Sequence, residues 1–168
     1  MPKQTPEQKV FEENKSFLKK LRVKSPKDLD DKFRDAHDEV FKNTDCLTCG
    51  NCCKTTSPIF IDTDIDRISK HLKTTSALFT AKYLTTDADN FQILKTAPCA
   101  FLGDDNFCHI YEVRPRACRE YPHTNRKRMY QILELTLENT KICPAVANIV
   151  DKLKDIYPVT SDRVVKKK

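Results

Sequence analysis

The sequence predicts a mainly α-helical fold, with short strands and irregular segments between the helices. Its 168 residues suit one small domain, and a hydrophobic fraction of 39% supports a modest core. Apolar residues recur at helical spacing towards both ends of the chain, whereas the middle holds seven of the eight cysteines. We therefore expect a single structural domain with helical ends and a cysteine-rich centre.

The first zone, residues 1–43, is predicted to form a helical hairpin. Apolar residues recur there in two runs, at the spacing found on one face of a helix. The two sets are Val10, Phe11, Phe17, Leu18 and Leu21, and then Leu29, Phe33, Ala36, Val40 and Phe41. Between them, Ser25 followed by Pro26 indicates the N-cap and the first residue of the second helix.

The second zone, residues 44–124, is predicted to mix short elements with turns. The expected elements are an extended segment at 58–61, a helix carrying Ile65, Ile68 and Leu72, a helix over 76–84, a short strand at 91–94 and a turn at 103–106. We interpret Asp62, Asp64 and Asp66 as capping residues at the start of the first helix. This zone has few apolar residues, so we expect metal binding to organise it.

The third zone, residues 125–168, is predicted to be a C-terminal helical segment that packs on the core. The residues that define its helices are Met129, Leu133 and Leu137, and then Val146, Ile149, Val150 and Leu153. Pro144 is placed to open the second of them. A strand is the alternative for the first, because Ile132 and Leu135 interrupt its pattern. Residues 164–168 fit a solubilising tail.

Composition argues against several classes of function. The chain has two glycines, Gly50 and Gly103, which cannot make a dinucleotide-binding or phosphate-binding loop. The formal charge is +6. Eight thiolates would add −8 and two divalent ions would return +4, so a chain with two bound ions would carry +2. The formal charge is therefore no clear sign of nucleic-acid binding. No apolar run reaches the about 18 residues of a membrane span, and residues 1–7 contain no apolar export segment. We expect a cytoplasmic protein without membrane or nucleic-acid partners.

The cysteines form the pattern from which a function can be inferred. Four are packed into Cys46-x-x-Cys49-x-x-Cys52-Cys53, and the others follow at Cys99, Cys108, Cys118 and Cys143. Disulfides would need an oxidising compartment, and adjacent Cys52 and Cys53 cannot bridge each other without strain. Overlapping C-x-x-C units in a cytoplasmic chain instead indicate thiolate ligands for zinc or iron. Backbone N–H groups in such turns can point at the sulfurs and lower their basicity.

Two four-thiolate sites would use all eight cysteines. We expect Cys53 to point away from Cys52, so that it binds a second metal or takes no part. One division joins the Cys46, Cys49 and Cys52 triplet to Cys143, which precedes a proline as in a ferredoxin-type ligand set. The second site would then consist of Cys53, Cys99, Cys108 and Cys118. The count of cysteines leaves other pairings open.

Two longer motifs follow the cysteine cluster. They are Pro98-Cys99-Ala100-Phe101-Leu102 and Cys108-His109-Ile110-Tyr111-Glu112-Val113-Arg114-Pro115-Arg116-Ala117-Cys118-Arg119-Glu120-Tyr121-Pro122. With them, residues 44–124 resemble the YkgJ-type cysteine-cluster family, the CxxCxxCC zinc- or iron-chelating domain.

The resemblance implies metal chelation by seven residues, which are Cys46, Cys49, Cys52, Cys53, Cys99, Cys108 and Cys118. Cys143 lies outside the strongest part of the motif. The resemblance implies less about activity, since members are described as metal-chelating or as Fe–S oxidoreductase-like. Flagellin lysine methylases carry a similar cluster, but this chain has neither the length nor a cofactor loop for methyl transfer.

Charged and aromatic residues near the last two cysteines of the motif are candidates for a supporting role. Arg114, Arg116 and Arg119 can offset the negative charge of a thiolate site, and ordinary surface ion pairs are the alternative. Tyr111 and Tyr121 could shield a metal from water.

Other polar residues are weaker candidates. His109 or His123 could replace a cysteine in a Cys₃His zinc site. His37 and His71 are expected on polar helix faces. The Arg126-Lys127-Arg128 run is expected to be a solvated helix start.

Three functions therefore remain open. The first is a metal-chelating protein that holds zinc or iron through cysteine thiolates. The second is an iron–sulfur redox or electron-transfer protein, or an oxidoreductase component. The third is a zinc-organised adaptor that binds protein or RNA. Metal ions are the one partner that the residues identify, and no catalytic residues can be assigned.

Overall fold

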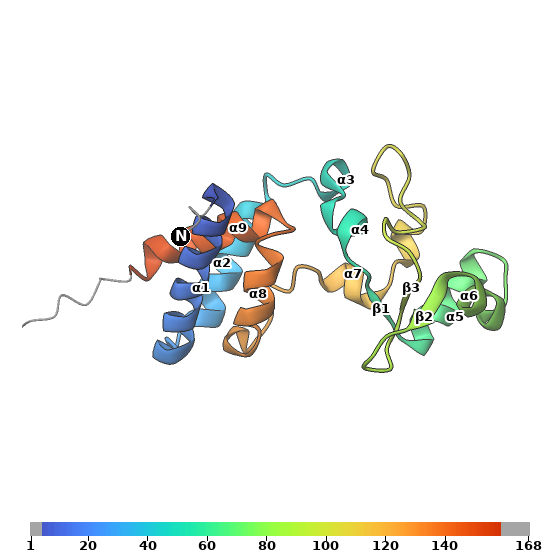
Figure 1. Cartoon of the computed structure of the whole chain (residues 1–168), viewed down its shortest axis with the longest axis horizontal. Helices are drawn as coiled ribbons and strands as arrows, with labels where there is room; N and C mark the ends of the chain where they lie inside the picture. The colour runs from blue at the N-terminus through green and yellow to red at the C-terminus, as the bar shows by residue number, and fades with distance from the viewer. Residues whose placement is uncertain (1–4, 159–168) are drawn as a thin grey trace, which may run out of the picture. The chain divides into compact units, whose positions relative to one another are not determined.

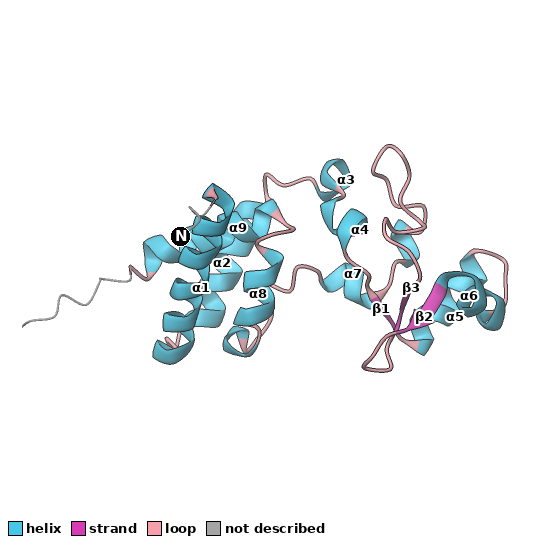
Figure 2. Ribbon diagram, in the orientation of Figure 1, coloured by secondary structure: helices cyan, strands magenta, loops and turns pink. Residues whose placement is uncertain are grey.

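The structure is a computed structural model that describes residues 5–158. It forms two compact units (Figure 1). The helical unit comprises the described parts of Met1–Thr44 and Pro122–Lys168, and the cysteine unit is Asp45–Tyr121. Helices dominate both units, which confirms the mainly α-helical prediction (Figure 2). The predicted tail at 164–168 lies outside the described residues.

The helical unit packs the two ends of the chain together. Its elements are α1 (Pro6–Lys24), α2 (Leu29–Phe41), the 3₁₀ turn η2 (Met129–Gln131), α8 (Leu133–Asn139) and α9 (Pro144–Ile156). Helix α2 packs on α9, and α1 packs on α8. Phe33, Val146 and Val150 lie at the centre of the core with no exposed surface. The periodic apolar residues that predicted these helices line the core of the unit, except Val10, which is exposed.

The boundary between α1 and α2 differs from the prediction. Ser25 adopts a left-handed conformation (φ 38°) and ends α1, because its N–H donates to the Leu21 carbonyl at 2.8 Å. The second helix begins later, at Leu29, after Asp28. Ser25 is thus a C-cap and Pro26 a helix terminator, so the N-cap prediction for this pair was wrong.

The cysteine unit combines short helices with a small sheet. Its elements are α3 (Cys46–Cys49), α4 (Asn51–Thr55), β1 (Ile59–Phe60), α5 (Asp62–His71), α6 (Ser76–Tyr83), β2 (Leu84–Thr86), β3 (Gln92–Leu94), η1 (Tyr111–Val113) and α7 (Arg116–Glu120). The strands are antiparallel in the order β1-β3-β2, with Phe60 opposite Gln92 and Leu84 opposite Leu94. Stacked and tilted aromatic rings fill its core, among them Phe79 and Phe101 at 6.1 Å.

Two local predictions for the cysteine unit need correction. The predicted helix over 76–84 stops at Tyr83, and Leu84 is already extended because it pairs with Leu94 in the sheet. The preceding Thr75 supplies the N-cap oxygen of α6. Helix α5 has Ile61 at its N-cap without a side-chain cap, so the acidic residues do not cap it as expected. The short helices α3 and α4 had no signal in the periodicity.

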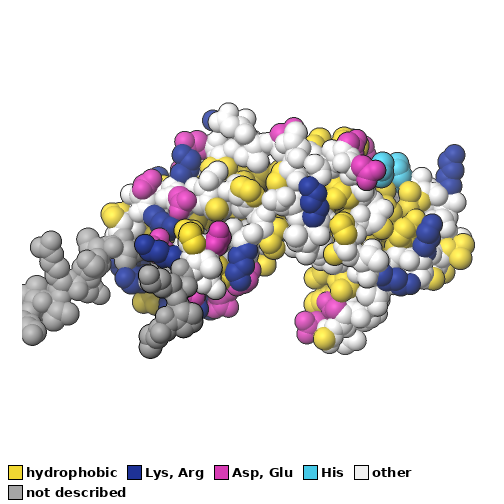
Figure 3. Space-filling view, turned by 45° about the horizontal axis from the view of Figure 1, so that its top comes forward, with side chains coloured by type: hydrophobic (Ala, Val, Ile, Leu, Met, Phe, Trp, Pro, Cys, Tyr) yellow, Lys and Arg dark blue, Asp and Glu magenta, His cyan; other side chains and the backbone are white. Residues whose placement is uncertain are grey.

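Charged residues of both signs are mixed on the face that Figure 3 shows. In the helical unit, Arg22 pairs with Glu134 at 2.5 Å and Lys152 pairs with Glu39 at 2.6 Å. These pairs are largely exposed and contribute about 0–1 kcal/mol each. Within residues 5–158, no helix has the length and apolar character to span a membrane.

His37 is not the polar-face residue that the sequence predicted. It is half-buried on α2, packs on the Phe41 ring at 4.4 Å, and hydrogen-bonds through Nδ1 to Oγ1 of the buried Thr124 at 2.8 Å. Burial lowers the pKa of His37 below its ordinary value of 6.5, outweighing the opposite effect of Asp38. His37 thus binds a proton less readily in the folded helical unit than in the unfolded chain.

We predict that the protein loses stability as the pH falls below 6.5. The unfolded chain binds a proton at His37 there and the folded chain resists it, so unfolding becomes more favourable. Thermal unfolding of the wild type and of His37→Gln between pH 7.5 and 5.5 tests this. The variant should lose less stability on acidification, and equal losses would contradict the prediction.

Candidate metal centre

The cysteines are divided between the two units. Seven lie in the cysteine unit, and Cys143 lies in the helical unit as the N-cap of α9, where it packs against the apolar core. All eight are thiols within the described residues, and no disulfide joins them. The cysteine unit therefore holds the whole set that the resemblance assigned to metal.

The first four cysteines lie on two short helices joined by a glycine. The Asp45 carboxylate accepts a hydrogen bond from the Leu47 N–H at 2.9 Å and caps α3. Gly50 then takes a left-handed conformation (φ 60°), which ends α3 and starts α4. The turn leaves little room, because a Cβ on Gly50 would lie 3.2 Å from the Asn106 side chain. Asn106 in turn donates from Nδ2 to the Thr48 carbonyl at 3.2 Å.

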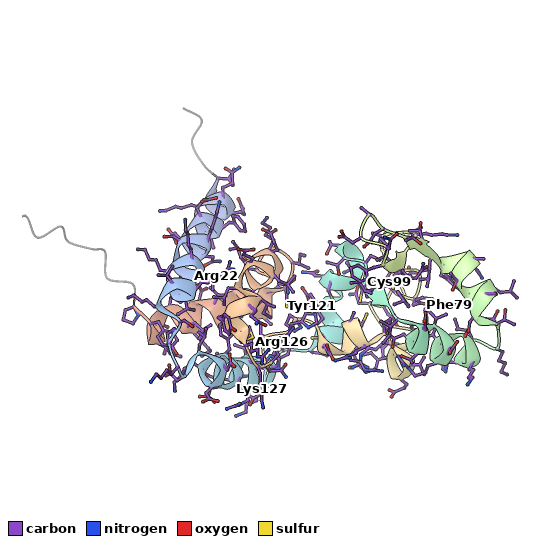
Figure 4. The ribbon with its side chains drawn as sticks, turned by 90° about the horizontal axis from the view of Figure 1, so that it is seen from below. Arg22, Phe79, Cys99, Tyr121, Arg126 and Lys127 are labelled. Carbon is purple, nitrogen blue, oxygen red and sulfur yellow. The ribbon has the colours of Figure 1, made fainter. Side chains whose placement is uncertain are left out.

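Backbone hydrogen bonds bring the later cysteines to the first group. The Cys99 N–H donates to the Cys53 carbonyl at 2.8 Å. From there the chain folds back on itself, with a bridge between Leu102 and Cys108. Cys99 and Cys108 pack against the aromatic core of the unit, which excludes water from one side of each thiol. Figure 4 labels Cys99 within this unit.

Five half-buried thiols act on one another electrostatically, and we call them the thiol cluster. They are Cys52, Cys53, Cys99, Cys108 and Cys118. Contrary to our expectation, Cys53 does not point away from Cys52, since their sulfurs lie 3.9 Å apart. The two residues share helix α4, where neighbours are rotated by about 100° and can approach each other.

The surroundings shift the thiol pKa values in both directions. The hydrogen bond between the two sulfurs lowers the pKa of Cys53 and raises that of Cys52 well above its ordinary range. Burial raises the pKa of Cys118 from 9.0 to about 12, and it also raises the pKa values of Cys99 and Cys108. Ionising several of these thiols together therefore needs a nearby cation.

Backbone donors partly offset this burial. The N–H groups of Phe101 and Leu102 hydrogen-bond to the Cys99 sulfur, and that of Ile110 hydrogen-bonds to the Cys108 sulfur. Each of these bonds lowers the thiol pKa, because it favours the thiolate. The sequence had suggested such bonds at the C-x-x-C turns, and here they surround two later cysteines.

The three arginines of the second long motif have different surroundings. Arg114 lies over the Tyr111 ring at 3.8 Å, and its charge lowers the pKa of Cys108 and Cys118. Arg116 pairs with Glu120 at 2.5 Å on the surface. Arg119 donates to the Arg114 carbonyl at 3.3 Å. Arg114 is therefore the arginine whose charge acts on the thiols.

The remaining candidate residues are divided between the two units. Tyr121 is half-buried directly after α7. The His109 ring lies beside Gly103, where an added Cβ would be 3.1 Å from Nε2. His123, the Arg126-Lys127-Arg128 run and Cys143 belong to the helical unit. Arg128 there takes a left-handed conformation (φ 61°), and its N–H donates to Asp30 at 2.7 Å.

The thiol cluster fits a metal that prefers sulfur ligands, because its donors are thiols and because water is partly excluded from them. Among residues 5–158, no three His, Cys, Asp or Glu side chains are already arranged to hold an ion. Metal binding there requires the thiols to approach one another and to release protons, so metal affinity should rise with pH.

Comparison with models of protein families identifies a match for this chain. Residues 45–144 match the family model CxxCxxCC, described as "Putative zinc- or iron-chelating domain". The matched range covers more than half of the chain and extends past residue 124 to include all eight cysteines. No curated protein and no solved structure matched the chain.

We predict that Gly50→Ala destabilises the protein. The left-handed backbone costs alanine about 1–2 kcal/mol, and the new Cβ also presses on Asn106. Thermal unfolding of the wild type and of Gly50→Ala measures the loss. A variant as stable as the wild type would contradict the prediction.

Proposed function

This chain belongs to the CxxCxxCC family, and we propose from that membership that its cysteine unit holds zinc or iron through cysteine thiolates. The observation that carries the proposal is the thiol cluster, in which residues from three separate segments influence one another's ionisation. The segments are α4, the loop around Cys99 and Cys108, and α7.

We assign one ion to Cys53, Cys99, Cys108 and Cys118. The pKa of Cys53 responds to all three of the others, and its carbonyl accepts the backbone hydrogen bond of Cys99. Four thiolates would complete the tetrahedral shell that zinc prefers. Cys46, Cys49 and Cys52, on α3 and α4, are left as ligands of a second ion.

The surrounding residues have definable tasks in this proposal. Backbone N–H groups at Cys99 and Cys108 favour the thiolate form. Arg114 supplies a positive charge where four thiolates would exceed the charge of one divalent ion. The aromatic core behind Cys99 and Cys108 keeps water away from their sulfurs. A zinc ion closed by four thiolates would act as a scaffold, whereas iron would supply redox chemistry.

An iron–sulfur redox role is the second candidate. The Cys46, Cys49 and Cys52 triplet falls inside the matched range and has the C-x-x-C-x-x-C spacing with which a ferredoxin-type set begins. Bound iron with acid-labile sulfide and broad visible absorption would support this role. Colourless protein that contains zinc would support the scaffold.

We predict that full-length protein purified without added metal contains zinc or iron by elemental analysis. Cys118→Ser should lose about one equivalent, because a tetrahedral site missing one thiolate binds more weakly. Ala117→Ser, on the same short helix, is the matched control and should keep its metal. Wild-type protein that is folded but metal-free would overturn the proposal.

Cys143→Ser tests the division into two sites. Loss of about one equivalent, with the first site intact, would add Cys143 to the set of metal ligands. Full metal content in this variant would remove Cys143 from the ligand set and leave the assignment of Cys53, Cys99, Cys108 and Cys118 in place.

A further inference from the structure

A buried carboxylate lies beside the segment that carries Cys118. Asp64, on α5, has 1% of its surface exposed. A carboxylate removed from water must be paired and hydrogen-bonded to be tolerated. Its Oδ1 lies 2.5 Å from Arg67 Nη2, and both of its oxygens accept from the Arg116 N–H, at 3.2 and 3.1 Å. Asp64 therefore binds the first residue of α7, more than forty positions along the chain.

Arg67 extends the same contact to the residues before α7. Besides Asp64, its guanidinium donates to the Val113 carbonyl at 3.3 Å and to the Arg114 carbonyl at 2.9 Å. One planar side chain thus holds a carboxylate on its own helix and two consecutive carbonyls of another segment. We call Asp64 and Arg67 the α5 clasp.

The clasped segment lies between two proposed metal ligands. Cys108 precedes it and Cys118 follows it on α7. Pro115, at its centre, is buried, so the chain has little freedom to turn there. Arg119 donates to the same Arg114 carbonyl that Arg67 binds. The backbone from 113 to 116 is therefore fixed from both sides.

The position of the Arg114 side chain depends on the contacts of this backbone segment. Its carbonyl is held by Arg67, and its guanidinium donates to the Tyr111 carbonyl at 2.7 Å and lies over the Tyr111 ring. The positive charge that acts on the thiols is thus anchored in the segment that the α5 clasp holds.

We propose that Asp64 and Arg67 are positioning residues for the metal site, which fix the 113–116 backbone and so set the placement of Cys118 and of the Arg114 charge. This inference rests on the proposed function. Helix capping does not explain the pair, because α5 has no side-chain cap and the Asp64 carboxylate faces another element.

Binding of Co²⁺ to the full-length chain tests the α5 clasp, because cobalt reports thiolate ligation and tetrahedral geometry by absorption. The variant is Arg67→Lys, which keeps the charge but cannot bind Asp64 and two carbonyls in one plane. The matched control is Asp62→Asn, an exposed acid in the first turn of the same helix. Affinity is measured by chelator competition, and thermal unfolding is measured in chelator.

We expect Arg67→Lys to bind Co²⁺ about 10–100-fold more weakly, as is typical when a group that orients a ligand is lost, and to shift the cobalt absorption bands. Asp62→Asn should match the wild type in both. Asp64→Asn, if it folds, should behave like Arg67→Lys, and Arg67→Lys carries the test if it does not.

Two results would overturn the inference, and they differ from a failure of the proposed function. Arg67→Lys with wild-type affinity and spectrum would show that the α5 clasp does not position the site. Weaker binding with an unchanged spectrum, matched by an equal loss of stability in chelator, would assign it to folding alone. If the wild type itself showed no thiolate–cobalt absorption, the proposed function would fail along with the inference.

Discussion

Burial of several thiols side by side, where each resists ionisation, is the constraint on which the cysteine unit depends. Burial raises the pKa values of Cys99, Cys108 and Cys118, so these thiols stay protonated at neutral pH in the absence of a strong cation. Bringing these thiols together adds little to the stability of the fold by itself. A divalent ion would stabilise it, because the ion replaces the thiol protons and is attracted to all of the sulfurs at once. The arrangement therefore makes physical sense as a metal site.

The two units differ in how their cores are built. The helical unit buries long, periodic apolar faces, and its core includes fully buried residues from α2 and α9. The cysteine unit has a smaller aromatic core, with short helices and strands joined by turns. Backbone bonds such as that from Cys99 to Cys53, the Gly50 turn and the α5 clasp connect these pieces. Metal ligation would add the cross-links that a core of this size lacks.

Sequence periodicity predicted the parts of the fold whose stability comes from burial along one helix face. The helices around Phe33, Ile68 and Ile149 follow their apolar spacing closely. Boundaries were harder, because Ser25 and Leu84 take conformations set by a helix end and by a strand partner. The close approach of Cys52 and Cys53 was also not predicted, because the helix that carries both is too short to produce a periodic signal.

The candidate site was predicted as a set of residues and not as an arrangement. Cysteine spacing and the motif around Cys118 predicted the donors that we propose, since ligand chemistry is carried by residue type. The role of Asp64 was missed because its partners, Arg67 and the Arg116 N–H, include a contact that depends on the tertiary fold. An Asp and an Arg three positions apart also fit an ordinary helix-surface pair, and burial is what distinguishes them.

The most direct test of metal ligation by thiolates is X-ray absorption at the metal edge of the full-length protein. Sulfur scatterers at about 2.3 Å, the zinc–thiolate distance, are predicted for a zinc-loaded chain. A shell made up of oxygen and nitrogen alone would show that the metal is bound elsewhere, and it would contradict the assignment of Cys53, Cys99, Cys108 and Cys118.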